Sequence, residues 1–158
     1  MLSAEQSAKS DALRIIARRH RSRQQLSDLL KAKGHAAKPI DQVLDQLEKA
    51  GLLNDEKYAK AVADSKLYLR PVGRRRLERD LKKKGLSDGV VRQTMESFKD
   101  YDETAAAMEV AQKRIRVMKN LPSEKKKARL FGFLQRRGFS SEAIYAALSK
   151  AIKEETVF

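Results

Sequence analysis

Apolar side chains recur along the chain at the spacing of a helix face. Positions i, i+3, i+4 and i+7 are filled in turn by Ile40, Val43, Leu44 and Leu47. The same spacing returns from Val91 to Phe98 and again from Ile144 to Ala151. Such spacing predicts amphipathic helices. No window sustains an alternation of apolar and polar residues, and runs rich in Val, Ile and Thr are absent, so the pattern predicts an all-α protein.

The helical pattern occurs three times. Each copy contains a basic residue followed by glycine, at Gly34, Gly85 and Gly138, and apolar residues recur at fixed offsets from these glycines. Glycine after a basic residue is typical of a helix C-terminus. The repetition predicts three tandem three-helix units, at residues 9–51, 52–100 and 101–153, with nine helices in all. Because each unit is too small to bury its faces alone, we expect an elongated, curved body in which neighbouring units pack together.

Prolines and cap residues predict the helix boundaries. We expect helices to begin near residues 9, 22 and 39 in the first unit, 55, 72 and 88 in the second, and 102, 123 and 141 in the third. Pro39 suits the first position of a helix, whereas Pro71 and Pro122 should end the helices that precede them.

Charge narrows the possible functions. The 158 residues include 35 Lys and Arg but 21 Asp and Glu, which gives a formal net charge of +14. A chain this basic usually binds a polyanion or an acidic partner. No apolar run reaches the length of a membrane span, and the N-terminus has no secretory signal, so we expect a cytoplasmic protein without membrane contact.

Catalytic and metal-binding patterns are absent from the sequence. Without cysteine, the chain has no disulfide, no thiol nucleophile and no cysteine-ligated metal. His20 and His35 share no ligand spacing with carboxylates, and we expect both in solvated turns. No glycine-rich phosphate loop and no nucleophile–base arrangement stand out. We therefore interpret the chain as a non-enzyme that needs no cofactor and no metal.

Basic residues gather in the second helix of each unit. The candidate residues for partner or DNA contact are Arg70, Arg74, Arg75, Arg76, Arg79, Lys82 and Lys83 in the middle unit, and Lys126, Lys127 and Arg129 in the third. For any single cation, solvation of an exposed helix face is the simpler interpretation. For the surface as a whole, the net charge favours contact with a polyanion or an acidic partner. Among the aromatic residues, Tyr68 is the one we expect to be exposed, because Lys66 and Arg70 flank it.

Three segments of the chain are similar to parts of one known family. GLLNDEKYA, from Gly51, is similar to that family's junction between its first two repeats. RPVGRRRLERDLKKKG, from Arg70, is similar to its basic stretch, although Arg76 stands where Ile is usual and Asp80 where Glu is usual. ALRIIARRHRSRQQLSDLLKAKG is similar to its opening repeat. Nearly the whole chain thus resembles the RecX family, whose members are bacterial regulators of the RecA recombinase.

The resemblance implies an inhibitor of RecA. Members of the family bind in the helical groove of the RecA–single-stranded DNA filament and suppress its ATP hydrolysis, strand exchange and coprotease activity. The resemblance also implies roles in DNA repair, DNA recombination and the SOS response. A basic monomer that binds single- and double-stranded DNA weakly, without sequence preference, would suit that groove.

A stand-alone DNA-binding protein is the alternative interpretation, with pairs of helices acting as helix-turn-helix units. A sequence reader would place base-reading polar side chains at the start of one recognition helix. Here those positions differ between the repeats: Asp41-Gln42, Arg92-Gln93 and Ser141-Glu142. These differences disfavour base-specific recognition.

Overall fold

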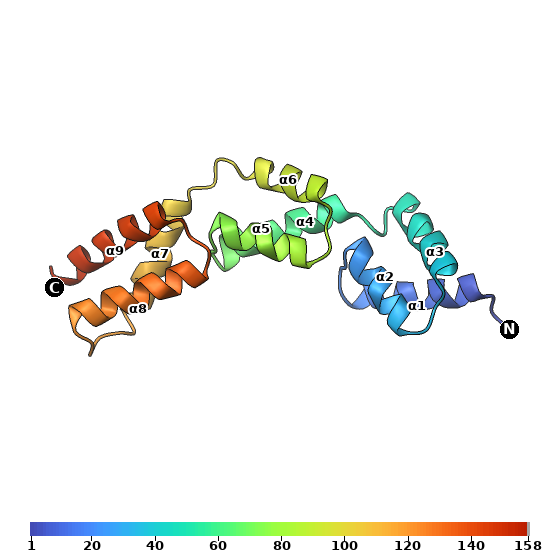
Figure 1. Cartoon of the computed structure of the whole chain (residues 1–158), viewed down its shortest axis with the longest axis horizontal. Coiled ribbons are helices and arrows are strands. Elements are labelled where there is room, and N and C mark those ends of the chain that lie inside the picture. Colours follow the sequence, from blue (N-terminus) through green and yellow to red (C-terminus); the bar gives the residue numbers. More distant parts are fainter. Residues whose placement is uncertain (158) are drawn as a thin grey trace. The chain divides into compact units, whose positions relative to one another are not determined.

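The computed structural model describes residues 1–157, which form nine α-helices and one π-helical turn (Figure 1). This part of the chain contains no strand, so the all-α class and the nine helices expected from sequence are confirmed. The first domain holds α1 (Ala4–Arg18), α2 (Arg23–Ala32) and α3 (Ala37–Lys49). The second holds α4 (Asp55–Asp64) with its π-helical continuation η1 (Ser65–Leu69), α5 (Arg74–Lys83) and α6 (Asp88–Ser97). The third holds α7 (Glu103–Ile115), α8 (Ser123–Arg136) and α9 (Ser141–Glu155).

The chain folds into two compact units, and the middle domain is divided between them. One unit comprises residues 1–62 and 81–94, and the other comprises residues 63–80 and those from 95 onward. The expected domain boundaries at 9–51, 52–100 and 101–153 stay a prediction, as does the elongated, curved body. None of the helices within residues 1–157 is long and apolar enough to cross a membrane.

The first domain packs α1, α2 and α3 around one apolar core. The hydroxyls of Ser3 and Ser22 each accept a hydrogen bond from the backbone amide three residues further on. Gln6 and Gln25 accept hydrogen bonds from the amides of these serines, so α1 and α2 each begin with a capping box. The largest core side chains are fully buried: Leu26, Leu30, Ile40, Leu44 and Leu47.

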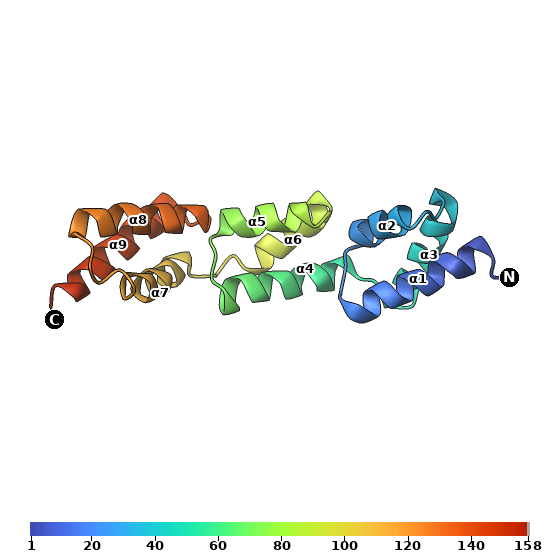
Figure 2. The same ribbon diagram turned by 90° about the horizontal axis from the view of Figure 1, so that it is seen from below.

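The third domain packs α7, α8 and α9 around a second core (Figure 2). Ala107 and Ala111 on α7 and Ala147 on α9 have no exposed surface, and small side chains of this kind let two helix backbones approach closely. Leu130 and Leu134 on α8 close the core and are also fully buried. The apolar face predicted for this repeat therefore lies in the interior.

Two helices in the first domain begin earlier than the sequence suggested. α1 begins at Ala4 instead of near residue 9, because the Ser3 cap precedes it. α3 begins at Ala37, so Pro39 is its third residue and not its first. Proline is tolerated there because the amides of the first helical turn have no partner inside the helix.

The third domain departs from the expected boundaries at the end of α7. This helix ends at Ile115, several residues before Pro122, and residues 116–121 form turns and a bend. The turns reverse the chain before α8 begins. Met118 stays buried within them, with 8% of its surface exposed.

Polar groups join the start of α2 to Lys84, which follows α5, and to the start of α4. The Ser22 hydroxyl donates to the Lys84 carbonyl, and the Arg23 amide donates to Asp55 Oδ1 at 2.8 Å. The Tyr58 hydroxyl donates to Gln25 Oε1 at 3.1 Å. The first two bonds give partners to the Lys84 carbonyl and the Arg23 amide, which have none inside their helices.

The same kind of junction joins the end of α8 to the start of α5. The Gly73 amide donates to the Arg137 carbonyl at 2.8 Å, and Arg76 Nη1 donates to the Arg136 carbonyl at 3.1 Å. The Arg137 guanidinium donates in return to the Pro71 carbonyl at 2.9 Å. Carbonyls at a helix C-terminus lack helical partners, and here the preceding domain supplies them.

Candidate polyanion-binding site

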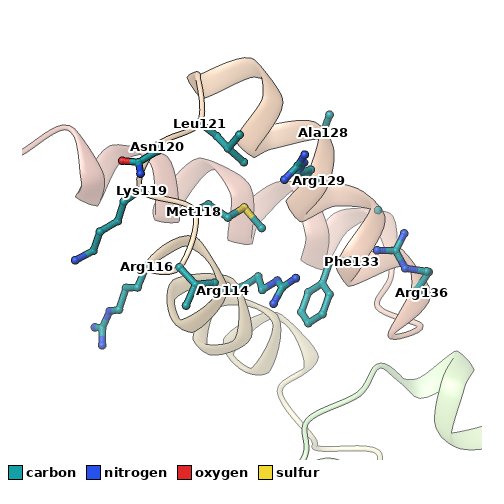
Figure 3. Close-up of a pocket in the computed structure, with 12 residues that line it drawn as sticks. Arg114, Arg116, Met118, Lys119, Asn120, Leu121, Ala128, Arg129, Phe133 and Arg136 are labelled. Atoms are coloured by element: carbon teal, nitrogen blue, oxygen red, sulfur yellow. The ribbon is translucent and has the colours of Figure 1, made fainter.

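A pocket of about 680 Å³ opens on the third domain (Figure 3). Its walls come from the end of α7, the turns at 116–121 and one face of α8. None of its lining side chains is acidic, and five are basic: Arg114, Arg116, Lys119, Arg129 and Arg136. A concave surface with one sign of charge concentrates ions of the opposite sign. We call this site the basic pocket.

The wall formed by α8 follows from helical spacing. Arg129, Gly132, Phe133 and Arg136 stand at i, i+3, i+4 and i+7, which places them on one side of the helix. Gly132 has no side chain, and the Arg136 guanidinium lies over it, since a Cβ on Gly132 would stand 3.1 Å from Arg136 Nη1. Glycine inside a helix costs about 1 kcal/mol relative to alanine, and here it leaves room for the Arg136 side chain along the pocket wall.

The turns after α7 supply the opposite wall. Ile115 and Met118 are buried and fix the course of the turns. The neighbouring Arg116, Val117 and Lys119 are exposed. The segment that reverses the chain therefore also presents two cations to solvent.

Two guanidinium groups stack on one ring beside the pocket. Arg114 Cζ lies 4.8 Å from the centre of the Phe133 ring, and Arg137 Cζ lies 5.0 Å from it. Stacking orients a guanidinium while its N–H groups stay available to oxygen acceptors. Within residues 1–157, none of the five pocket cations forms an ion pair with a carboxylate. Unneutralised cations around a hollow suit phosphate oxygens.

The middle domain carries seven of the candidate residues. They differ in whether the side chain is exposed to a partner or already engaged within the protein. Arg75 and Arg79 are exposed, lie one helical turn apart and form no ion pair with any described residue. Arg70, Lys82 and Lys83 are exposed at the two ends of this segment. These positions are consistent with contact to a partner, which stays a prediction.

Arg74 and Arg76 are instead engaged within the protein. Arg74 Nη2 donates to the carbonyls of Lys99 and Tyr101 at 2.8 and 2.9 Å. These bonds hold the segment that follows α6 against the start of α5. Arg76 Nε lies 3.1 Å from Asp80 Oδ1, and its Nη1 bonds the Arg136 carbonyl. Their guanidinium groups are therefore less available than those of Arg75 and Arg79.

The three candidate residues of the third domain differ more clearly in burial and in pairing. Lys126 is buried, with 7% of its surface exposed, and its ammonium pairs with Glu155. This pairing argues against the expected role of Lys126 in partner contact, and we leave it out of the proposed surface. Lys127 is exposed but pairs with Glu124 at 3.0 Å. Arg129 is the candidate that lines the basic pocket.

Four pocket cations were not among the sequence candidates: Arg114, Arg116, Lys119 and Arg136. The spacing of Arg129 and Arg136 is a signal that sequence reasoning could have used. The other three could not be found, because the sequence pattern continues the helix of α7 through the residues that form the turns.

The two histidines differ in environment, and His20 is exposed between α1 and α2, as expected. His35 was expected in a solvated turn, but its side chain is 13% exposed and its Nε2 lies 2.8 Å from Asp11 Oδ2. The expectation is wrong because α1 lies beside the start of α3. The hydrogen bond from His35, assisted by the charge of Lys33, holds the pKa of Asp11 below its usual value. Among residues 1–157, no group of three or more His, Cys, Asp or Glu side chains is placed to hold a metal.

Fold and surface together define a class of protein, a helical-repeat protein with three three-helix domains and a cationic pocket. Family models match it domain by domain. The models described as the first, second and third three-helix domains of RecX match residues 8–47, 54–95 and 100–148. These matches cover most of the sequence, and the chain belongs to the RecX family.

Curated relatives match along nearly the whole length. Proteins named Regulatory protein RecX from Thermobifida fusca, Chlorobaculum tepidum and Halorhodospira halophila are 30%, 33% and 30% identical to this chain. The matches cover 95%, 95% and 97% of this chain and 81%, 91% and 93% of the relatives. The resemblance noted in the sequence is thereby confirmed.

Solved structures share the fold. A crystal structure of RecX from Lactobacillus salivarius has a TM-score of 0.78 at 19% identity and covers 94% of this chain and 96% of its own. A second crystal structure, of a regulatory protein RecX, has a TM-score of 0.80 at 20% identity and covers 93% of this chain and 73% of its own. At these identities the likeness shows the fold alone.

Proposed function

We propose that this chain is a non-enzymatic inhibitor of the RecA recombinase that binds the groove of the RecA–single-stranded DNA filament. The observation that carries the proposal is the family match in all three domains. By binding there it suppresses ATP hydrolysis, strand exchange and coprotease activity. It acts as a monomer in the cytoplasm, in DNA repair, recombination and the SOS response, and needs no cofactor.

The charge of the chain supports a filament partner. Its formal net charge of +14 favours a surface of DNA phosphates and acidic side chains. Arg75 and Arg79, which are exposed and form no ion pair with a described residue, offer one contact on the middle domain. Charge reversal there should weaken binding without touching a core residue, because Leu77 and Leu81 carry the buried side of α5.

The basic pocket supports a direct but unspecific DNA contact. Its cations fit phosphate oxygens, which are the same at every base pair, so this contact carries no sequence information. Lys and Arg that neutralise phosphates release counterions, and the affinity then falls steeply with salt. Binding to bare DNA should therefore be weak at physiological salt.

A filament-binding assay separates this function from plain DNA binding. The chain has no cysteine, so Ser149→Cys on the exposed side of α9 gives a single site for a fluorophore. The labelled protein is mixed with bare oligo(dT) or with RecA–oligo(dT) filaments in a nonhydrolysable ATP analogue, and fluorescence anisotropy is followed as salt rises. We expect filament binding to persist at salt concentrations that abolish binding to bare DNA. Equal salt sensitivity of both would favour a stand-alone DNA-binding protein.

A further inference from the structure

A second hollow, of about 310 Å³, lies beside the basic pocket in the unit that contains residues 63–80 and the third domain. It adjoins the end of η1, the end of α7 and α8. Arg114, Val117 and Phe133 line both hollows. The second hollow has more apolar surface, and Leu69, Pro71 and Val110 line it but not the basic pocket. We call it the apolar hollow.

Apolar side chains project from the protein at this place. Leu69 is 79% exposed and Val117 is 71% exposed, and both line the hollow. Single exposed apolar residues are ordinary, but two that share a concave site rimmed by charge are typical of a protein contact. The aliphatic surface is thus already placed where a partner could cover it.

The fold holds Leu69 in its exposed position. η1 closes with a bond from the Arg70 amide to the Ser65 carbonyl at 3.1 Å, and the Val72 amide bonds the Lys66 carbonyl at 3.0 Å. Leu67 and Val72 on either side are buried, with 2% and 7% exposed. Both flanking residues are anchored in the core. Leu69 therefore cannot turn inward unless Leu67 and Val72 leave their buried positions. π-helical turns of this kind occur often at functional sites.

The course of the chain holds Val117 in the same way. Ile115 and Met118, before and after it, are buried. Val117 is therefore exposed because α7 ends at Ile115 and the turn that follows keeps Met118 in the core. Neither apolar residue has a place in the core to return to.

Cations without counter-ions surround the hollow. Arg70, Arg114 and Arg137 line it, and none of them forms an ion pair with a carboxylate of the described chain. Glu109 is the acidic residue of the lining, and it pairs with Lys113 at 2.7 Å. Burial, followed by the charges of Arg76, Arg114 and Arg70, lowers the pKa of Arg137. Arg137 thus lies among like charges, and an incoming anion would reduce the repulsion between them.

We propose that the apolar hollow docks an acidic segment of a partner protein, in which carboxylates flank a side chain the size of Leu or Phe. The apolar side chain covers Leu69 and Val117. The carboxylates pair with Arg70 and Arg114, whose planar guanidinium groups match a carboxylate at two points. This proposal goes beyond the RecA-inhibiting function and does not depend on which protein carries the segment.

Charge complementarity selects this occupant over two others. A nucleic acid strand would satisfy the cations through its phosphates, but it has no aliphatic side chain to bury against Leu69 and Val117. A second copy of this chain carries the same net charge of +14 and would repel the first. An acidic segment with an apolar side chain satisfies both halves of the surface.

Peptide binding tests the proposal. The probe is a short fluorescein-labelled peptide in which Asp and Glu flank a Leu-Phe pair, and the control peptide has Ser-Ser in place of that pair. We expect the parent protein to bind the Leu-Phe peptide about tenfold more tightly, because burying one such side chain contributes that much or more. Equal binding of the two peptides would mean attraction by charge alone and would overturn the proposal.

Variants locate the contact. Leu69→Ser with Val117→Ser should remove the preference for the Leu-Phe peptide. Arg70→Gln with Arg114→Gln should weaken both peptides. The matched control is Leu52→Ser, a change at a leucine of the first domain that is 55% exposed. Circular dichroism confirms that each variant is folded. Unchanged peptide binding by the Leu69/Val117 variant, or self-association that this variant abolishes, would overturn the proposal.

Discussion

Gly73 lies so close to Gly138 that a Cβ on Gly73 would stand 2.0 Å from the Gly138 carbonyl oxygen. The Gly73 amide bonds the neighbouring Arg137 carbonyl at 2.8 Å. Gly138 itself has φ +79°, and a Cβ there would lie 2.4 Å from the Arg76 backbone nitrogen. Both residues must be glycine for α5 and the end of α8 to meet through their backbones.

Replacing Gly73 by alanine should therefore destabilise the protein. The obstructing atoms are backbone, which cannot move aside as a side chain can, so we expect a loss of about 1–3 kcal/mol or more in the free energy of unfolding. Urea denaturation measures it. Gly89→Ala is the matched control, because its Cβ would meet only the Ser87 hydroxyl, at 4.0 Å. Gly89 lies in α6, where alanine should be neutral or stabilising by about 1 kcal/mol. Equal stabilities of the two variants would contradict the close packing.

The ion pair between the buried Lys126 and Glu155 predicts a structural role for Lys126. Lys126→Ala should lower the free energy of unfolding by about 1–2 kcal/mol, less than for a fully buried pair because Glu155 keeps part of its surface in water. Lys127→Ala, which breaks the exposed pair with Glu124, should change it by about 0.5 kcal/mol or less. Thermal and urea denaturation compare them. If Lys126→Ala leaves stability intact but weakens DNA binding, the lysine belongs to the binding surface after all.

The difference between these lysines shows what sequence alone could provide. The apolar columns of the repeat are confirmed, since Leu26, Leu77 and Leu130 have no exposed surface. Lys126 stands four residues before Leu130, and this spacing places it on the inward side of α8. That signal was available in the sequence. Its partner Glu155 was not, because it approaches only through the packing of α9.

The candidate site also has one part that the sequence could predict and one part that it could not. Exposure of Arg75 and Arg79 follows from the inward direction of Leu77 and Leu81, so helical spacing sufficed. The basic pocket depends on where α7 ends, and no proline or glycine marks Ile115 as a terminus. Tertiary packing sets that end, which is why the cations of the turns could not be assigned to a pocket from the sequence.

The basic pocket predicts a change in the salt dependence of DNA binding. Arg129→Gln with Arg136→Gln removes two phosphate contacts, and the slope of log affinity against log salt should fall by about 1.4 for single-stranded DNA. Anisotropy of fluorescein-labelled oligo(dT) across a salt series measures it. Lys38→Gln with Lys60→Gln removes the same charge from exposed residues elsewhere. A slope that falls equally in both variants would indicate diffuse attraction and no pocket.

Tyr101 predicts a late step in alkaline titration. Burial, with a contribution from the charge of Glu103, raises its pKa from 10.0 to about 12. Its hydroxyl donates to the Leu67 carbonyl at 3.2 Å. Because the folded pKa lies above the unfolded value, this phenol contributes stability that is fully present below about pH 10 and is lost as the pH rises toward 12.

Phenolate absorbance isolates that step. Subtracting the titration of a Tyr101→Phe variant from that of the parent should leave one transition near pH 12. A transition near pH 10 would show that the Tyr101 hydroxyl is solvated in the folded protein.

The exposed arginines of α5 predict a loss of inhibition without a loss of fold. Arg75→Glu with Arg79→Glu should leave the helical circular dichroism signal in place and change stability by about 0.5 kcal/mol or less at each site. Inhibition of RecA should drop sharply, since two attractive contacts become repulsive. Lys38→Glu with Lys60→Glu makes the same change in net charge away from α5. If the Arg75/Arg79 variant inhibits RecA as strongly as the Lys38/Lys60 variant, the face formed by Arg75 and Arg79 is not the contact surface.

RecA ATP hydrolysis on single-stranded DNA tests the central claim most directly. This protein is titrated into RecA of the same source on saturating DNA, and more DNA is then added at the inhibited end point. We expect hydrolysis to fall at well below equimolar protein and to stay low after the addition, because the filament and not the free DNA is bound. Hydrolysis that is unchanged in a large excess of protein, or that recovers fully when DNA is added, would contradict a regulator of the RecA filament.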